Sequence, residues 1–437
     1  MRTNLVRSII GLCAFTAIHT NAEFKAAVFH SSEFTNNADL SDTDEPSERE
    51  DRTGLEVEYT HQAQNWLFNF DYQFEKVNFD SNAQIPEEDT EEYEGTTGFD
   101  GLFFRQRLGL RTSYRRENLL TDPAELSVQN NITARDTFVF EPTLNFYRND
   151  ADNLSLTGFF HKIRFDDDFL QTRSIGSETK GLRLGWTRKV SSVDNFIAQI
   201  ENSETEYDQN GVDTLDYQNI QLGYAAQLRK LNYTVLVGYN RSSSSSTQDL
   251  ESPSALIQAL YQSGPTQINF FANYLITDTS RGNQNGITGS LSESNNQQLG
   301  NGDTSIIDSY ELLSGQLKVS NRWCRRCLAE FEVGFADEDY SVDDTESLQQ
   351  LDISGSLGYE LTSKLSVEFE VGYQTQSREI PQPTLEYDED IYILSAEYYH
   401  SEKLSTGVSA LYRDRDAEDD ARSYQEASLT LDIRYEF

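Results

Sequence analysis

Apolar and polar residues alternate along most of this chain, and this alternation restricts it to two-faced β-strands. The clearest run is residues 65–75, where one face holds the rings of Trp66, Phe68, Phe70, Tyr72 and Phe74. The pattern recurs in later segments, among them residues 231–239, 365–373 and 429–437. Strands of soluble β-sandwiches run about 5–6 residues. The runs here extend over about 10–14 residues, the length with which a tilted strand crosses a bilayer.

The connections between these runs alternate between short and long. Short turns are expected near residues 61–65, 148–152, 190–194, 229–231, 262–266, 321–325, 361–364 and 400–403. Long polar segments are expected near residues 35–52, 80–98, 167–177, 207–213, 241–253, 279–304, 337–348, 377–388 and 414–424. Short turns at one rim and long loops at the other are typical of an outer-membrane barrel.

The predicted fold is therefore all-β: a transmembrane, antiparallel, up-and-down β-barrel of about 18–20 strands with both termini in the periplasm. About 19 strands are clear, whereas closure with both termini on one side requires an even number. A weakly patterned strand within residues 119–133 would restore parity, and residues 102–115 are expected to form one of the clear strands. Residues 23–437 are expected to make a single barrel domain.

The N-terminus has the pattern of an export signal. A charged stretch (MRTNLVRS) is followed by a short apolar stretch (IIGLCAFTAI) and by HTNA, which places a small residue before Glu23. This order is that of a secretory signal peptide. We expect residues 1–22 to be removed and the barrel to reside in the bacterial outer membrane.

Composition excludes several other classes of protein. The chain carries 73 acidic and 35 basic side chains, a net charge of −38. Binding to nucleic acid or to anionic lipid needs clustered Lys and Arg, so neither is expected. A high net charge is also a mark of disorder, but 3 Trp, 23 Tyr and 25 Phe argue against it.

The C-terminal segment LTLDIRYEF alternates and ends in an aromatic residue. It resembles the assembly signal of bacterial outer-membrane barrels, and this resemblance implies that Tyr435 and Phe437 contact the barrel assembly machinery. More broadly, the chain resembles the β-barrel porins associated with exopolysaccharide gene clusters. The opening strand AEFKAAVFHSSEF, an early acidic loop and hairpins such as FVFEPTLNFYRNDADNLSLTGFF carry this resemblance. It implies a role beside polysaccharide export or surface-layer assembly, with polysaccharide export components as partners.

If the aromatic faces meet lipid, the residues between them face the lumen. Basic residues then form one wall: Arg105, Arg107, Arg111, Arg115 and Arg183. Acidic residues form another: Glu330, Glu332, Glu368, Glu370 and Glu397. Facing walls of opposite charge would select ions and orient polar solutes in a water-filled channel. The alternative is that these groups pair across a filled lumen and only stabilise it.

Cys324 and Cys327 stand in the sequence WCRRC, which resembles the active site of thioredoxin-like oxidoreductases. That chemistry belongs to a helix N-terminus in a βαβ unit, whereas this motif falls at a turn between two expected strands. A structural disulfide in an oxidising compartment is the favoured interpretation. No histidine pair is spaced to complete a zinc site, so no metal site is expected.

We expect no enzyme activity, catalytic residues or cofactor. His61 and His400 fall in expected turns, His161 lies on a strand, and His30, which precedes Ser31 and Ser32, is more readily a solvated side chain than a catalytic base. The acidic segments 81–94 and 337–346 are expected either to be solvated surface or to bind Ca²⁺ or Mg²⁺ weakly. Such ions would bridge them to the phosphates of outer-membrane lipid and lipopolysaccharide.

The sequence thus predicts an outer-membrane, porin-like channel for small polar solutes or saccharide chains, with the link to exopolysaccharide export that the resemblance implies. The alternative is a non-conducting structural or interaction barrel. It would act through its acidic extracellular loops in adhesion or surface polysaccharide assembly.

Overall fold

The computed structural model describes residues 21–37, 40, 47–81, 90–120, 132–165, 176–208, 214–244, 249–278, 309–340, 347–378, 386–418 and 422–437. The first ten strands in this part of the chain are β1 (Asn21–Thr35), β2 (Glu48–Gln62), β3 (Trp66–Ser81), β4 (Thr90–Phe103), β5 (Leu108–Leu120), β6 (Ile132–Arg148), β7 (Asp152–Phe165), β8 (Ser177–Lys189), β9 (Asp194–Tyr207) and β10 (Leu215–Gln227). The next ten are β11 (Leu231–Ser244), β12 (Leu250–Ser263), β13 (Thr266–Asp278), β14 (Ser309–Cys324), β15 (Cys327–Tyr340), β16 (Leu348–Glu360), β17 (Leu365–Arg378), β18 (Tyr387–Tyr399), β19 (Leu404–Ala417) and β20 (Tyr424–Glu436). Among the described residues, no helix is long and apolar enough to cross a membrane.

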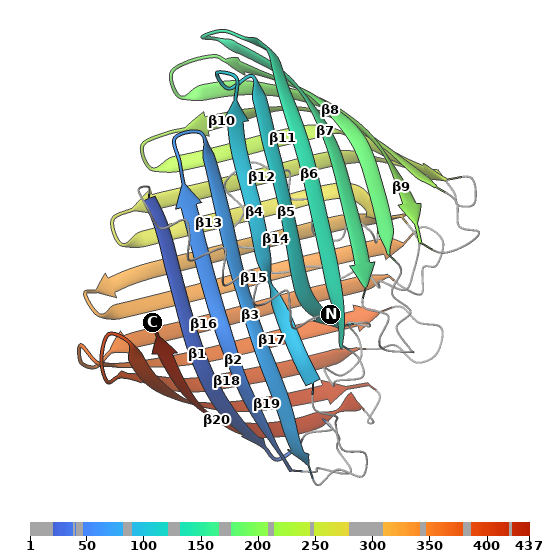
Figure 1. Cartoon of the computed structure of the whole chain (residues 1–437). Coiled ribbons are helices and arrows are strands. Elements are labelled where there is room, and N and C mark those ends of the chain that lie inside the picture. The colour runs from blue at the N-terminus through green and yellow to red at the C-terminus, as the bar shows by residue number, and fades with distance from the viewer. Residues whose placement is uncertain are drawn as a thin grey trace.

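Each strand pairs antiparallel with the next, and β20 pairs with β1, so the sheet closes on itself (Figure 1). The closing pair runs from Ala27 opposite Glu436 to Thr35 opposite Ser428. Closure gives every described strand a partner on both sides, which a bilayer requires of any β-structure. The structure confirms the predicted antiparallel barrel, and its twenty strands fall within the predicted range.

The two rims of the barrel differ. At one rim, which we call the short-turn rim, the strands are joined by residues 63–65, 104–107, 149–151, 190–193, 228–230, 264–265, 325–326, 361–364 and 400–403. The start of β1 and the end of β20 lie at this rim, where the amide of Phe437 donates to the carbonyl of Ala26 at 2.9 Å. The other connections join the strands at the opposite rim, the long-connection rim. Residues 1–20, and with them most of the expected signal peptide, lie outside the described residues.

One strand, β4, differs from the prediction made from the sequence. Residues 90–103 form β4, although most of them were expected to be loop. The expected strand over 102–115 is wrong, because Phe104, Arg105 and Gln106 have positive φ angles and make a tight turn between β4 and β5. The extra strand sought within 119–133 is not needed for parity. Its central residues, 121–131, lie outside the described part of the chain.

Glycine residues explain why the sequence of β4 lacks the alternation of apolar and polar residues that marks the other strands. The outward face of β4 carries Gly95 opposite Tyr72 and Gly101 opposite Trp66, two aromatic residues of β3. A Cβ on Gly95 would lie 2.2 Å from the carbonyl oxygen of Asp71 and 2.8 Å from the Tyr72 ring. Aromatic side chains of one strand therefore supply the apolar surface that the glycines of the next strand lack. The lipid-facing surface over β4 therefore remains apolar, although the sequence of β4 does not alternate.

An apolar belt surrounds the barrel. Outward-facing side chains such as Leu182, Ile220 and Val237 are more than half exposed, as lipid-facing groups are in a chain viewed without its membrane. Aromatic residues border this belt at the short-turn rim with Trp323, Tyr359, Tyr398 and Tyr435. Toward the other rim, outward tyrosines donate to carboxylates, from Tyr114 to Asp136 at 2.7 Å, from Tyr239 to Glu251 at 2.6 Å and from Tyr373 to Asp388 at 2.7 Å. Paired aromatic girdles are what holds a barrel at a fixed depth in a bilayer.

Candidate functional site

Strand register decides which side chains face the lumen. On β15 and β17 the large apolar residues Phe331 and Phe369 are 46% and 44% exposed and form part of the lipid-facing belt. Their neighbours on the other face therefore point inward, because successive side chains of a strand alternate. Residues paired across strands share a face, so the whole inner wall follows from the register.

The inner face of β15–β20 carries many carboxylates and few cations, and we call it the acidic arc. It contains the five residues predicted as an acidic wall, together with Asp352, Glu360 and Asp432. Lys318 on β14 lies 3.6 Å from Glu330 and 3.5 Å from Glu332. Glu397 accepts a hydrogen bond from Tyr399 at 2.5 Å. In the described part of the chain Glu368 and Glu370 make no ion pair, so their charges act on the lumen uncompensated.

The structure contains only part of the basic wall that the sequence predicts. Arg105 and Arg107 lie in the tight turn at the short-turn rim, so their assignment to a lumen wall is wrong. The reason is that the alternation over 102–115 spans two strands and the turn between them. Arg111 and Arg115 on β5 and Arg183 on β8 do face inward.

These three arginines stand among carboxylates. The Nε of Arg183 donates to Glu201 at 2.7 Å, and Arg115 lies 3.7 Å from Glu117. Arg111 is placed opposite Asp100 and Glu141 in the register. This side of the lumen is therefore nearly compensated rather than basic, and the pairing occurs within a strand or between adjacent strands instead of across the lumen.

A third region of the wall has no charge, and sequence reasoning missed it. Every inward side chain of β10–β13 is uncharged, and many are amides: Asn219, Gln221, Gln227, Asn232, Asn240, Gln258, Gln262, Gln267, Asn269 and Asn273. We call this region the amide arc. Gln199 donates to Gln221 at 2.5 Å, and Gln221 donates to Ser254 at 3.3 Å across Gly238, whose missing side chain makes room for it. The signal was present in the sequence as the absence of charge from one face of residues 215–278.

Exposure of the inner wall changes along the barrel axis. From the middle of the barrel to the long-connection rim, inward side chains such as Leu236, Leu256 and Asn240 are almost completely buried. The rings of Tyr310 and Tyr340 stack there at 4.7 Å and are buried as well. Toward the short-turn rim, Gln227, Gln262 and Glu368 are exposed. The described inner wall is thus accessible to solvent near the short-turn rim, and its side chains are buried farther along the barrel axis.

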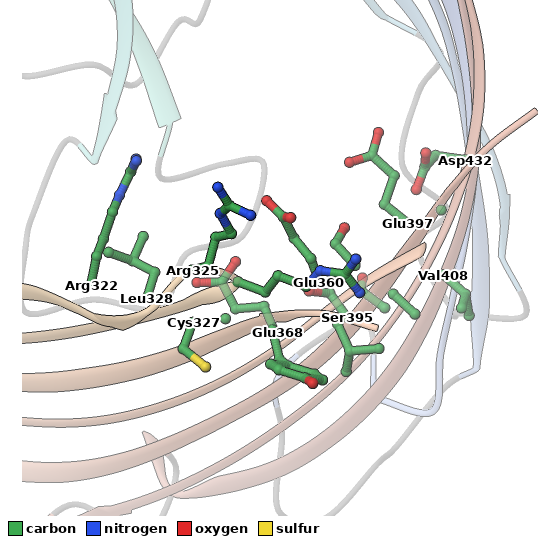
Figure 2. A pocket seen from close by; sticks show the side chains of 18 residues that line it. Arg322, Arg325, Cys327, Leu328, Glu360, Glu368, Ser395, Glu397, Val408 and Asp432 are labelled. Carbon is green, nitrogen blue, oxygen red and sulfur yellow. The ribbon is translucent and has the colours of Figure 1, made fainter. Parts of the chain in front are cut away.

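The turn between β14 and β15 holds the disulfide between Cys324 and Cys327. This turn borders a cavity of about 420 Å³ on the inner wall at the short-turn rim (Figure 2). Arg322, Arg325 and Arg326 line one end of it, and carboxylates of the acidic arc line the rest. Glu368 and Glu397 are the predicted site residues that reach this cavity, whereas the three arginines were not predicted to face the lumen.

None of the histidines in the described part of the chain forms a recognisable catalytic arrangement. Ser32 donates to Asp51 at 2.5 Å, and the Nε2 of His30 lies 3.4 Å from the same hydroxyl. The Nδ1 of His30 contacts Thr53 at 2.9 Å, so the hydroxyl proton of Ser32 is directed to a carboxylate and not to the imidazole. His161 faces the lumen 3.4 Å from Glu141.

The expected ion-binding loops are described only in part. Glu91, Glu92 and Glu94 belong to β4, and Asp337, Glu338 and Asp339 belong to β15, while most other residues of these acidic segments lie outside the described residues. Within the described ranges no group of three or more His, Cys, Asp and Glu side chains is arranged to hold a metal ion. At the C-terminus, Tyr435 and Phe437 contact each other edge to face and are exposed on the outer surface.

The comparisons with known proteins address the fold. Neither protein-family models nor curated proteins give a match to this sequence. Among solved structures, the siderophore receptor PirA from Acinetobacter baumannii is similar, with 10% identity and a TM-score of 0.55 over 96% of this chain and 81% of that one. A mutant of the ferric enterobactin receptor PfeA from Pseudomonas aeruginosa has 10% identity and a TM-score of 0.53 over the same shares. OccK5 from Pseudomonas aeruginosa is also matched, with 10% identity and a TM-score of 0.40 over 95% and 98%.

At this level of identity the likeness concerns the fold alone. The fold is that of outer-membrane β-barrel proteins, and it agrees with the outer-membrane location expected from the sequence. What passes through the barrel, or binds to it, has to be argued from its own inner wall.

Proposed function

We propose that this chain is an outer-membrane channel for small polar solutes. The observation that carries the proposal is the inner wall near the short-turn rim, where polar and charged side chains of the acidic and amide arcs are accessible to solvent. A barrel with a hydrated polar lumen lowers the cost of moving a polar solute through the membrane, because the solute keeps hydrogen-bonding partners along its path.

The finer form of the proposal concerns saccharide chains. The amide arc offers uncharged donors and acceptors, which suit hydroxyl-rich solutes that carry no charge. Together with the resemblance to exopolysaccharide-associated barrels, this supports saccharide transport and a link to exopolysaccharide export. Uptake of uncharged sugars into proteoliposomes, compared with that of charged solutes of equal size, would test it.

A second candidate function rests on the burial of the inner wall away from the short-turn rim. Burial of inward side chains near the long-connection rim favours a non-conducting barrel that acts through its acidic connections in adhesion or polysaccharide assembly. In either case the proposed partners are outer-membrane lipid and lipopolysaccharide around the belt, the barrel assembly machinery at the C-terminal strand, and polysaccharide export components. Nucleic acid is not among them, given the net charge of −38.

Recording from the purified, refolded barrel in a planar bilayer separates the two candidates. The channel proposal expects stable open currents, with a preference for cations because uncompensated carboxylates face the lumen. Protein that is shown to be folded by its heat-modifiable electrophoretic mobility, but that gives no current, would overturn the channel proposal and favour the non-conducting barrel.

A further inference from the structure

The cavity at the short-turn rim has the layout of a binding site. It extends along the inner wall from β14 to β20, and its floor is made of small inward residues: Gly358, Ser366, Ser395, Gly407 and Ser409. Small residues on neighbouring strands leave a hollow between the longer side chains around them. The volume of about 420 Å³ lies in the range of small-molecule sites.

Charges of opposite sign stand at the two ends of this hollow. Arg322 on β14 and Arg325 in the disulfide turn lie at one end, and Glu397 on β18 and Asp432 on β20 lie at the other (Figure 2). Gly407 has no side chain, and a Cβ there would lie 2.1 Å from a carboxylate oxygen of Asp432, so this glycine makes room for that carboxylate. In the described structure, no ion pair joins either arginine to a carboxylate.

The disulfide fixes the basic end. The bond between Cys324 and Cys327 encloses Arg325 and Arg326 in a four-residue loop. The amide of Arg326 donates to the sulfur of Cys324 at 3.3 Å, and its guanidinium reaches the carbonyl of Leu361 at 3.5 Å. Cys327 is buried against the wall, so the loop cannot swing away from the cavity as a longer turn could.

We propose that this cavity binds small zwitterions, solutes that carry one carboxylate and one ammonium group, such as amino acids and short peptides. The solute carboxylate would be held by the Arg322 and Arg325 guanidiniums, which form paired hydrogen bonds to carboxylates. The ammonium group would lie between Glu397 and Asp432. A simple anion meets repulsion from the acidic end and a simple cation from the basic end, so each is bound less well than a solute with both charges.

This inference deepens the proposed channel function by naming a solute class for its lumen, but binding can be measured without conduction. The probe is glycylglycine, titrated into the refolded full-length barrel in detergent and followed by saturation-transfer NMR. Two analogues serve as matched ligands: N-acetylglycylglycine, which lacks the ammonium group, and glycylglycinamide, which lacks the carboxylate. Each is expected to bind about tenfold more weakly than glycylglycine, the factor that corresponds to about 1.4 kcal/mol.

Variants assign each charge of the ligand to its end of the cavity. The double variant Arg322→Gln and Arg325→Gln should bind glycylglycine and glycylglycinamide equally, because both partners of the carboxylate are gone. The double variant Glu397→Gln and Asp432→Asn should bind glycylglycine and N-acetylglycylglycine equally, because both partners of the ammonium group are gone. Arg229→Gln and Glu402→Gln, in short turns at the same rim, should behave as wild type, because neither residue lines the cavity. If the arginine double variant does not fold, Arg322→Gln alone should still narrow the difference between glycylglycine and glycylglycinamide.

Equal binding of all three ligands by the wild-type barrel would overturn the proposal, as would a preference that survives both cavity variants. Specific binding by a barrel that passes no current would uphold the site and refute the channel. A current, together with equal binding of the three ligands, would uphold the channel and refute the site.

Discussion

Replacing Glu368 and Glu370 by glutamine is expected to lower the cation selectivity of the channel. Both carboxylates face the lumen from β17, and neither is neutralised by an ion pair in the described part of the chain. Glutamine keeps the size and hydrogen-bonding capacity of glutamate, so each substitution removes one negative charge and little else.

The size of the effect follows from Coulomb's law. A unit charge about 10 Å from a permeating ion in water contributes about 0.4 kcal/mol. At an ionic strength of about 0.01 M the Debye length is about 30 Å, and screening leaves about 0.3 kcal/mol. A cation gains this energy and an anion loses it. Two carboxylates together therefore shift the difference between cation and anion by about 1.2 kcal/mol, or about sevenfold in permeability ratio.

Reversal potentials in a planar bilayer under a KCl gradient measure this ratio. At about 1 M salt the Debye length falls to about 3 Å and the difference between variant and wild type should vanish. Two controls should match wild type in dilute salt: Glu402→Gln in the short turn 400–403, and Arg183→Gln with Glu201→Gln, which removes a paired positive and negative charge together. An unchanged ratio in dilute salt would refute the placement of β17 on a water-filled lumen.

Three further substitutions test the packing of the wall. Arg415→Met breaks a buried ion pair with Glu389 (2.9 Å) and should lower the free energy of unfolding in urea by about 3–5 kcal/mol, because the carboxylate is left buried and unpaired. Gly95→Ala introduces a clash with the backbone of β3 and should cost about 1–3 kcal/mol in the same assay, whereas Gly315→Ala, whose nearest neighbour is 3.5 Å away, should cost less than about 1 kcal/mol. The double variant Cys324→Ser and Cys327→Ser should still fold and lose at most about 2 kcal/mol, because the disulfide closes only a four-residue loop. No loss for Arg415→Met, or equal losses for the two glycine variants, would contradict the packing described for these sites.

Much of this fold can be predicted from the sequence because every strand of a membrane barrel is subject to the same two constraints. Lipid on one side and water on the other force alternation, and the width of the bilayer sets the strand length. The prediction fails where one strand supplies the apolar surface of its neighbour, as Tyr72 does for Gly95 of β4. The turn at Phe104–Gln106 could not be predicted either. Its three consecutive residues have positive φ angles, yet none of them is a glycine that would indicate such a turn.

The inner wall is harder to predict because its electrostatics depend on pairs, not on single residues. Alternation correctly indicates that Arg183 points away from lipid, but only the register brings Glu201 alongside it and cancels its charge. The same holds for Lys318 beside Glu330. The disulfide loop adds a feature that alternation cannot predict, since Arg325 lies in a turn and nevertheless lines the cavity.

The distribution of these features along the barrel axis bears on how such a channel would work. The zwitterion cavity and the exposed part of the acidic arc lie at the short-turn rim, while the buried inner side chains lie toward the opposite end. A solute that enters at the short-turn rim would therefore meet the selective charges before it reaches the part of the wall whose side chains are buried. Binding and passage are then separable steps. Substitutions at Arg325 or Glu397 should change which solutes bind. They should not change the conductance to small ions in concentrated salt, because the salt screens the charges of these two side chains. A conductance that fell with these variants at high salt would place the narrowest part of the pathway at the cavity itself.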